Sequence, residues 1–440
     1  MGVVRVMTTT QDLGWQARLH ELRQMTDPEI DDLVDQYRRD HPDVDTVRSL
    51  VMQMLRELGE AKADPGWRPA TTAGQAGERL SSLLNPPPLP LWAEDKQQID
   101  RGQELFRNTG LYQAVALFFA SLPMAYAARD GGAQALYRVS DLATQNLTRR
   151  VAETGQMLID VMGIRDSNTL EPGGTGYETA IGLRLLHSCV RALLLDPENQ
   201  EPWPSDLGPP VNQELLLATL LDFTIVTWRA MGRMGVELEP QDREAHLYTW
   251  SVMGWLMGLD ACQQGPLTRP DVEEISSLLS DRLGATDSGR RLMAALLAEM
   301  EEFMGLGWRK LPRSLVHWLF RDAPYGVNRV PEYLDVGPPA WWAGPLFGCL
   351  RAANRRERLL GPLRPMARLV IRKAGRYIIL AYADKYADRP LPFRIPPELA
   401  RSWRIRQGPV ARTMRERRRA VRQRVRTRRG DPLGTQGVRR

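Results

Sequence analysis

The chain has 440 residues, of which 43% are hydrophobic and 25% are charged, and this balance excludes a wholly disordered protein. The formal net charge of +6 is unevenly distributed, because residues 401–440 carry fifteen arginines against only Glu416 and Asp431. The other 400 residues therefore have a formal net charge of −7, which excludes a uniformly basic body that binds nucleic acid.

Residues 1–25 lack the long apolar core, the twin arginine and the small-residue cleavage site of a signal peptide. The three cysteines, Cys189, Cys262 and Cys349, are far apart and have neither the CxxC spacing of a zinc site nor the density of a disulfide framework. This cysteine usage suits a reducing compartment. We therefore expect a cytoplasmic protein, with peripheral contact to a membrane left open.

Apolar residues recur at helical spacing along almost the whole chain, and no convincing set of alternating strands is present, so the predicted class is all-α. The segment TDPE predicts a helix start, with Thr26 as the cap, Pro28 in the first turn and Glu29 completing a capping box. A second helix is expected near 46–62. Together with the proline- and glycine-rich connection that follows, these helices form an N-terminal region over 1–80.

The main body is predicted over 81–390, where the helical segments are longer and more apolar and no internal repeat is apparent. Its longest apolar run, 111–128, contains Gln113, Ser121 and Pro123 and would barely span a bilayer, so we interpret it as a buried helix. Breaks such as EPGGTG and EPWPSDLGPP are typical of loops between packed helices. The body is therefore expected to be one catalytic domain.

The segment NLTRRVAETGQMLIDVMG predicts a helix on which Arg150 and Thr154, spaced i and i+4, share a face. A guanidinium and a hydroxyl on one face can orient a polar ligand by hydrogen bonds, although this pair also occurs on solvated surfaces. Glu153 is a candidate acid or base if it points inward, and a solvent-facing position is the alternative. The loop IRDSNTLEPGGTG then predicts an antiparallel return, which could place two helices on opposite sides of a pocket.

His187 lies in the middle of the returning helix, GLRLLHSCVRALLL, and shares approximately one face with Arg184 and Arg191, one turn to either side. A helical histidine often fills the proximal position of a haem, since neutral imidazole is the commonest metal ligand. Arginines one turn from such a ligand would find anionic partners in the two haem propionates. The alternative is a core histidine that is satisfied by a backbone carbonyl.

Two further apolar helices are expected to be central to the body. The first, VNQELLLATLLDFTIVTWRAMGRMGVEL, begins with Asn212 as its cap, and the carboxylate of Asp222 within it must either face solvent or find an arginine. The second, EAHLYTWSVMGWLMGLDAC, aligns His246, Trp250 and two methionines, and Gly254 permits close packing. Core packing is the favoured interpretation of this stripe, with iron ligation by His246 or a methionine as the alternative.

The arginine-rich tail over 391–440 includes RTMRERRRAVRQRVRTRRG, which could form a basic helix but lacks a continuous apolar stripe. A solvated tail is one interpretation. Contact with an anionic membrane or with nucleic acid through counterion release is the functional alternative. In either case we expect the tail to contribute little to the core.

Several stretches, in order and spacing, resemble the MpaB-like and rubber oxygenase (latex clearing protein) family of haem b oxygenases: RRVAET, LEPGGTG, RLLHSCVR, VNQELLLATLLDF and HLYTWSVMGWLMGLD. The resemblance covers residues 100–270 closely. It implies a globin-like helical bundle around one haem b, with His187 as the proximal iron ligand and Arg150 and Thr154 as motif residues near the haem. The rubber-cleaving branch has a lysine just before the threonine, whereas this chain has Glu153, which cannot replace an amine ligand.

These features together predict a haem b-dependent oxygenase that uses O₂ on an apolar, unsaturated or isoprenoid-like small molecule, with oxidative cleavage of a C=C bond as the leading reaction. The iron would activate O₂ in a mostly dry pocket, and Arg150 and Thr154 would supply polarity beside it. Two other classes remain open. One is a haem-binding protein without turnover, and the other is a helical interaction protein that docks through its basic tail.

Overall fold

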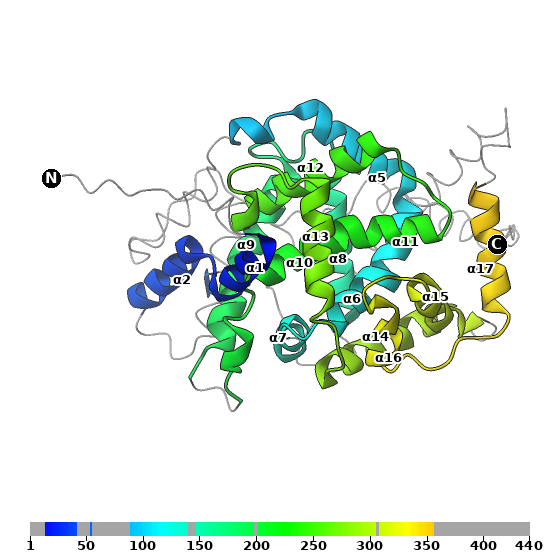
Figure 1. Cartoon of the computed structure of the whole chain (residues 1–440). Helices are drawn as coiled ribbons and strands as arrows, with labels where there is room; N and C mark the ends of the chain where they lie inside the picture. The colour runs from blue at the N-terminus through cyan, green and yellow to red at the C-terminus, as the bar shows by residue number, and fades with distance from the viewer. Residues whose placement is uncertain are drawn as a thin grey trace, which may run out of the picture.

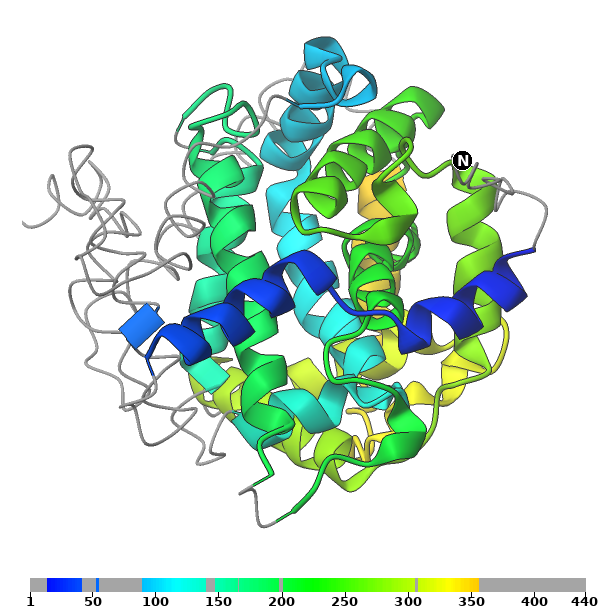
Figure 2. The ribbon, with the colours of Figure 1, turned by 90° about the vertical axis from the view of Figure 1, so that its left-hand side faces the viewer.

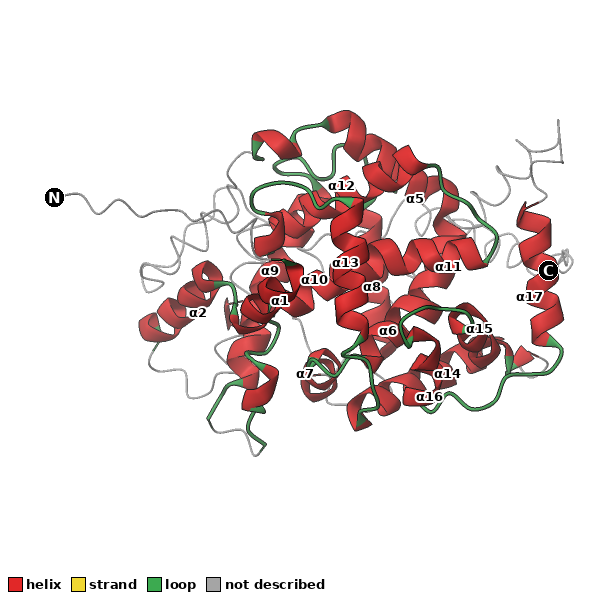
Figure 3. Ribbon diagram, viewed as in Figure 1, coloured by secondary structure: helices red, strands yellow, loops and turns green. Residues whose placement is uncertain are grey.

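The computed structural model describes residues 14–41, 53–54, 89–139, 147–164, 166–197, 201–304 and 308–355. In this part of the chain the regular elements are helices and there is no strand, only an isolated antiparallel bridge between Ala128 and Leu283 (Figure 3). The all-α prediction is confirmed. The helix expected near 46–62, apart from residues 53–54, and the tail over 391–440 lie outside the described residues.

Two N-terminal helices, α1 (Trp15–Gln24) and α2 (Pro28–Asp40), precede the main body, and α1 was not predicted. The predicted cap of α2 was wrong by one residue, since the side chain of Asp27, rather than that of Thr26, accepts the backbone N–H three residues further on. Pro28 occupies the first helical position, which it favours, so the residue before it becomes the cap. Glu29 closes no capping box and pairs instead with an arginine of the main body.

Two long helical rods cross the middle of the body. One consists of α5 (Lys96–Ala116), the π-helical turn η3 (Leu117–Ser121) and α6 (Leu122–Ala127), and the other of α10 (Gln213–Leu221), the π-helical turn η5 (Asp222–Val226) and α11 (Thr227–Arg233). The two π-helical turns touch, and the Ser121 hydroxyl donates a hydrogen bond to the Asp222 carbonyl at 2.6 Å. The predicted cap at Asn212 is confirmed, because its side chain accepts the Leu215 N–H at 3.0 Å.

A third rod, α12 (Pro240–Leu256), packs closely along α5. An added Cβ at Gly102 would lie 2.5 Å from the Ala245 carbonyl oxygen, so a residue other than glycine does not fit at this crossing. Close packing at Gly254 is also confirmed, because an added Cβ there would lie 2.9 Å from the Cys262 sulfur. The two glycines therefore set how near α12 approaches its neighbours.

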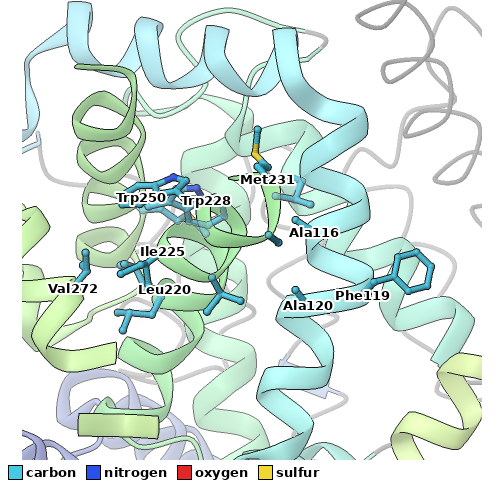
Figure 4. Close-up of a cluster of buried hydrophobic side chains, with 14 of the residues drawn as sticks. Ala116, Phe119, Ala120, Leu220, Ile225, Trp228, Met231, Trp250 and Val272 are labelled. Carbon is cyan, nitrogen blue, oxygen red and sulfur yellow. The ribbon is translucent and has the colours of Figure 1, made fainter. Parts of the chain in front are cut away.

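Apolar side chains of these rods form the core. In Figure 4, Ala116 and Ala120 of the first rod lie opposite Ile225, Trp228 and Met231 of the second rod. Two stretches, Lys96–Ala127 and Gln213–Arg233, are long and apolar enough to cross a membrane by length and composition. Within the fold, 50% and 61% of their apolar windows are buried, as in the core helices of a bundle.

The remaining helices surround these rods, with α9 beside α1 and α2 at one side of the molecule and α15 to α17 at the other (Figure 1). Their bounds are α7 (Gly132–Val139), α8 (Leu147–Val161), α9 (Thr175–Leu194), α13 (Arg269–Ser280), α14 (Asp287–Met304), α15 (Leu311–Phe320), α16 (Val330–Tyr333) and α17 (Ala343–Arg355). Short 3-10 turns join several of them: η2 (Leu91–Ala93), η4 (Ser205–Leu207), η6 (Asp260–Cys262) and η8 (Val327–Arg329).

Candidate functional site

The predicted antiparallel return of α8 and α9 is confirmed, since the two helices pack side by side and are joined by a short loop. The Thr179 hydroxyl donates a hydrogen bond to the Asp160 carboxylate at 3.0 Å. Nearby, an added Cβ at Gly176 would lie 3.0 Å from the Asp160 carbonyl oxygen, so the backbones approach closely. These contacts fix the register of the helix pair at its loop end.

This register places Thr154 and His187 on the paired stretch of the two helices, at different heights. Thr154 lies six residues before Asp160 on α8, or about 9 Å along the helix axis, and His187 lies eight residues after Thr179 on α9, or about 12 Å. Both side chains are half-buried. Arg150 and Glu153 also belong to α8, but their side chains lie outside the described part of the structure, so their predicted roles stay predictions.

The surface of α9 next to His187 is apolar and only partly covered. Leu183, Leu186 and Val190, which follow one stripe of the helix, are half-buried, whereas Leu185 and Cys189 on another face are completely buried. Across the helix pair, an added Cβ at Gly155 would meet no atom within 4 Å. His187 therefore lies beside an apolar strip of helix surface rather than inside a filled core.

The expectation that Arg184 faces an anionic ligand was wrong. Its guanidinium forms a bidentate pair with Asp27, with one N–H bond of 2.8 Å, and a further bond of 2.9 Å to Glu29. A guanidinium already neutralised by two carboxylates is not available to a haem propionate. The sequence could not show this, because Asp27 lies 157 residues away along the chain.

The same correction applies to Arg191. Its Nε and Nη2 donate to the Asp31 carboxylate at 2.8 to 3.0 Å, and its Nη1 donates to the carbonyl oxygens of Pro210 at 3.1 Å and Val211 at 2.6 Å. The side chain is 5% exposed. Arg191 is therefore a buried junction between helices, and its cationic group is fully used within the protein.

His246 is a core residue, and the alternative of iron ligation by it was wrong. The indole N–H of Trp228 points at its Nδ1 at 3.1 Å, and that of Trp250 points at its Nε2 at 3.3 Å, so neither ring nitrogen faces an open position. Burial lowers the pKa of His246 to about 3, which keeps the imidazole neutral.

Comparison with known proteins now bears on these helices. Residues 107–378, more than half of the chain, match the family model described as "ER-bound oxygenase mpaB/B'/Rubber oxygenase, catalytic domain". The chain belongs to this family. The oxygenase match begins after α1 and α2, so the helices whose carboxylates hold Arg184 and Arg191 precede the catalytic domain.

Two relatives illustrate the likeness. The chain is 27% identical over 223 residues to a rubber oxygenase from Streptomyces sp. (strain K30) and spans about half the length of that relative, 50% of each chain being covered. The solved structure of latex clearing protein LCP in the closed state has the same fold, with a TM-score of 0.50 over 87% of this chain and 90% of that chain, at 20% identity. The predicted membership of the MpaB-like and rubber oxygenase family is confirmed.

Within the oxygenase domain, Asp222 has neither of its two predicted environments, because no arginine of the described residues pairs with it and burial raises the pKa of its carboxyl well above the usual range. Asp130 lies close enough to add to this shift, and the pKa of Asp130 is itself raised to about 6, chiefly by burial. The neutral form of a carboxyl is the third solution for a buried position, which the sequence interpretation had omitted.

Two cavities among the described residues lie away from the predicted site. One of about 580 Å³ is lined by His317, Trp318, Arg321 and Trp341, and another of about 240 Å³ by residues of α5 and the loop before α9. No group of three His, Cys, Asp or Glu side chains that could hold a metal ion occurs in the described ranges. A haem needs only one such ligand from the protein, which His187 can supply.

Proposed function

We propose that this protein is a haem b-dependent oxygenase that uses O₂ on an apolar, unsaturated or isoprenoid-like small molecule, with oxidative cleavage of a C=C bond as its leading reaction. The observation that carries the proposal is that His187 and Thr154 lie half-buried on paired, antiparallel helices of a chain that matches an oxygenase catalytic domain. The Streptomyces relative, a rubber oxygenase by name, supports an apolar substrate.

The residues present fit a haem at two points. His187 offers an imidazole from a helix, and the half-buried Leu183, Leu186 and Val190 offer the apolar surface that a porphyrin ring requires. They do not supply the cationic partners first expected for its propionates, since Arg184 and Arg191 are paired with α2. Other residues must therefore receive those carboxylates.

Bound haem supplies the one-electron and O₂ chemistry that no amino-acid side chain provides. His187 would hold the iron, and the apolar stripe of α9 would exclude water from one side of the ring. The Thr154 hydroxyl, on the paired helix α8, would donate a hydrogen bond to a polar ligand. Arg150 would add a cationic donor one turn before it, and Glu153 would act as an acid or base, as the sequence predicts.

The test is an absorbance spectrum of the protein titrated with haem, followed by assay under O₂ with an isoprenoid oligomer and detection of carbonyl products. We expect a Soret band at one haem per chain and carbonyl products that require O₂. His187→Ala should lose haem or change the spectrum while helix content is kept. Full retention of haem with an unchanged spectrum would refute the ligand assignment.

His317→Ala is the matched control, because His317 is also a half-buried histidine on a helix and bonds the carbonyl oxygens of Val336 and Gly337 at 3.0 and 3.1 Å. It should leave the Soret band unchanged. Haem binding without any product under O₂ would favour a haem-binding protein without turnover. Replacing Thr154 by alanine should lower turnover with less effect on haem content.

We further propose that the tail over 391–440 lets a cytoplasmic oxygenase contact an anionic surface. Its support is the charge alone: the fifteen arginines after residue 400 would release counterions on contact with anionic lipid. Removing residues 405–440 should leave haem content and turnover unchanged and abolish salt-sensitive binding to anionic liposomes. Loss of haem on truncation would instead mean that the tail packs against the body.

A further inference from the structure

Helix α2 lies across α9 (Figure 2), and its side chains contact α9 on both sides of position 187. Asp27 and Asp31 of this N-terminal segment reach three positions on one face of α9: Asp27 pairs with Arg184, and Asp31 bonds both Ser188 and Arg191. On a helix, positions 184, 188 and 191 form one continuous stripe. The contacts between α2 and α9 therefore extend from the turn before His187 to the turn after it.

The pairs are bidentate and largely removed from solvent, which makes them geometrically specific. Side-chain exposure is 17% for Arg184 and 7% for Asp27, and 5% for Arg191 and 26% for Asp31. The turn after α12 covers the Arg184–Asp27 pair. Gly258 there has φ +73°, and an added Cβ would lie 2.5 Å from the Arg184 Nε.

Arg191 ties α9 to a strained loop as well. Val211 has φ +51°, a conformation that is unfavourable for a β-branched residue and that persists only where neighbours enforce it. Its carbonyl and that of Pro210 both accept hydrogen bonds from Arg191. Asp31 thus connects α2, α9 and the start of α10 through a single guanidinium.

We propose that Asp27 and Asp31 are positioning residues for His187. They fix the helix that presents the imidazole, and they neutralise the guanidinium on either side of it. This inference rests on the proposed role of His187 as the iron ligand. It extends that role to two residues outside the matched catalytic domain, for which neither the helix pattern nor the family match assigns a function.

The two effects can be measured separately. An unpaired guanidinium one turn from the ligand would favour the reduced, less positive state of a bound iron group, whereas loosening of the helix alone carries no such sign. Asparagine at 27 or 31 keeps the shape of the side chain and removes its charge, and asparagine caps a helix as well as aspartate does. Asp35→Asn is the matched control, because Asp35 is an exposed residue of the same helix.

The first experiment uses the full-length protein without haem. Amide hydrogen exchange should be several-fold faster along α9 in Asp31→Asn and Asp27→Asn than in wild type, and unchanged in Asp35→Asn. Unchanged exchange in both variants would refute the claim that Asp27 and Asp31 of this segment stabilise α9. This experiment does not depend on haem, so it separates failure of this inference from failure of the proposed function, which a wild-type protein without a Soret band would reveal.

The second experiment measures the midpoint potential of the haem-loaded protein. Asp31→Asn should shift it to a more positive value, Arg191→Gln to a more negative value, and the double variant should return toward wild type. Asp27→Asn and Arg184→Gln form a second pair with the same expected signs, should Arg191→Gln fail to fold. Shifts of the same sign in both members of a pair, or no shift, would overturn charge neutralisation.

Discussion

Asp130 is a buried carboxyl group whose protonation couples stability to pH. Asp130 is 4% exposed and accepts the Gly132 N–H at 3.1 Å, and burial raises its pKa from 3.8 to about 6. A carboxyl with a raised pKa in the folded state stabilises the fold below pH 4, and this contribution is lost as pH rises through 6. The shift corresponds to a free energy of unfolding of at most about 3 kcal/mol.

Asp130→Asn should therefore become more stable than wild type as pH rises from 4 to 7, by up to about 3 kcal/mol. The amide oxygen can still accept the Gly132 N–H, so the local hydrogen bond is kept. Urea unfolding across this pH range gives the measurement, with the exposed Asp206→Asn as the control. A stability difference that does not vary with pH would contradict the assignment.

His246 should dominate the acid side of the stability profile. Complete burial lowers its pKa to about 3. Between pH 6.5 and 3 the imidazole is therefore protonated in the unfolded chain and neutral in the folded protein. The contribution of His246 is therefore full above pH 6.5 and falls as pH drops toward 3, by up to about 5 kcal/mol. His246→Gln should flatten this acid limb in urea unfolding, and identical acid limbs in the two proteins would show that the imidazole is not the group responsible.

At the scale of helices, the crossing of α5 and α12 depends on Gly102. An alanine there would bring its Cβ to 2.5 Å from the Ala245 carbonyl oxygen, and backbone cannot yield as a flexible side chain would. Gly102→Ala should cost about 3 kcal/mol of stability, measured by urea unfolding. Gly232→Ala is the control, because an added Cβ there meets no atom within 4 Å, and it should be neutral or stabilising by up to about 1 kcal/mol.

Local signals in the sequence predicted the helical elements well where the deciding residues are neighbours. The cap at Asn212, the antiparallel return of α8 and α9 and the close packing at Gly254 all depend on residues within a few turns of one another. Helix α1 escaped prediction because its apolar face is short and no side chain caps it. The π-helical turns have no sequence signature, since the pattern of apolar residues continues through them.

The candidate site was predictable only in its list of residues. Spacing identified His187 and Thr154, and the pairing at Asp160 places them on adjacent helices. The partners of Arg184 and Arg191 were not predictable, because they come from a helix 157 to 160 residues earlier in the chain. The sequence of a helical face with arginines beside a histidine does not show whether a ligand or another helix neutralises the arginines.

For the whole molecule, the N-terminal helices should be required for stability although they precede the matched catalytic domain. Arg18, Arg23, Asp27 and Asp31 all form ion pairs with the body, and without the N-terminal helices Arg184 and Arg191 would lose the carboxylates that pair with them. Removing one partner of a buried pair typically costs about 3 to 5 kcal/mol. A chain that begins at residue 89 should therefore melt at a much lower temperature than the full chain in calorimetry, and equal melting would show that the body folds without them.

The two touching π-helical turns also bear on how this protein tolerates insertion and deletion. Each turn, Leu117–Ser121 and Asp222–Val226, holds one residue more than an α-helix of the same rise would need. Deleting one residue from either turn would therefore restore regular α-helix with about the same rise and rotation, whereas a deletion in the α-helical part of a rod would rotate everything beyond it by about 100°. In the second rod the segment beyond the turn would keep its orientation, including the contact of Trp228 with His246, and the change would be confined to the turn itself, where the Asp222 carbonyl oxygen accepts the Ser121 hydroxyl.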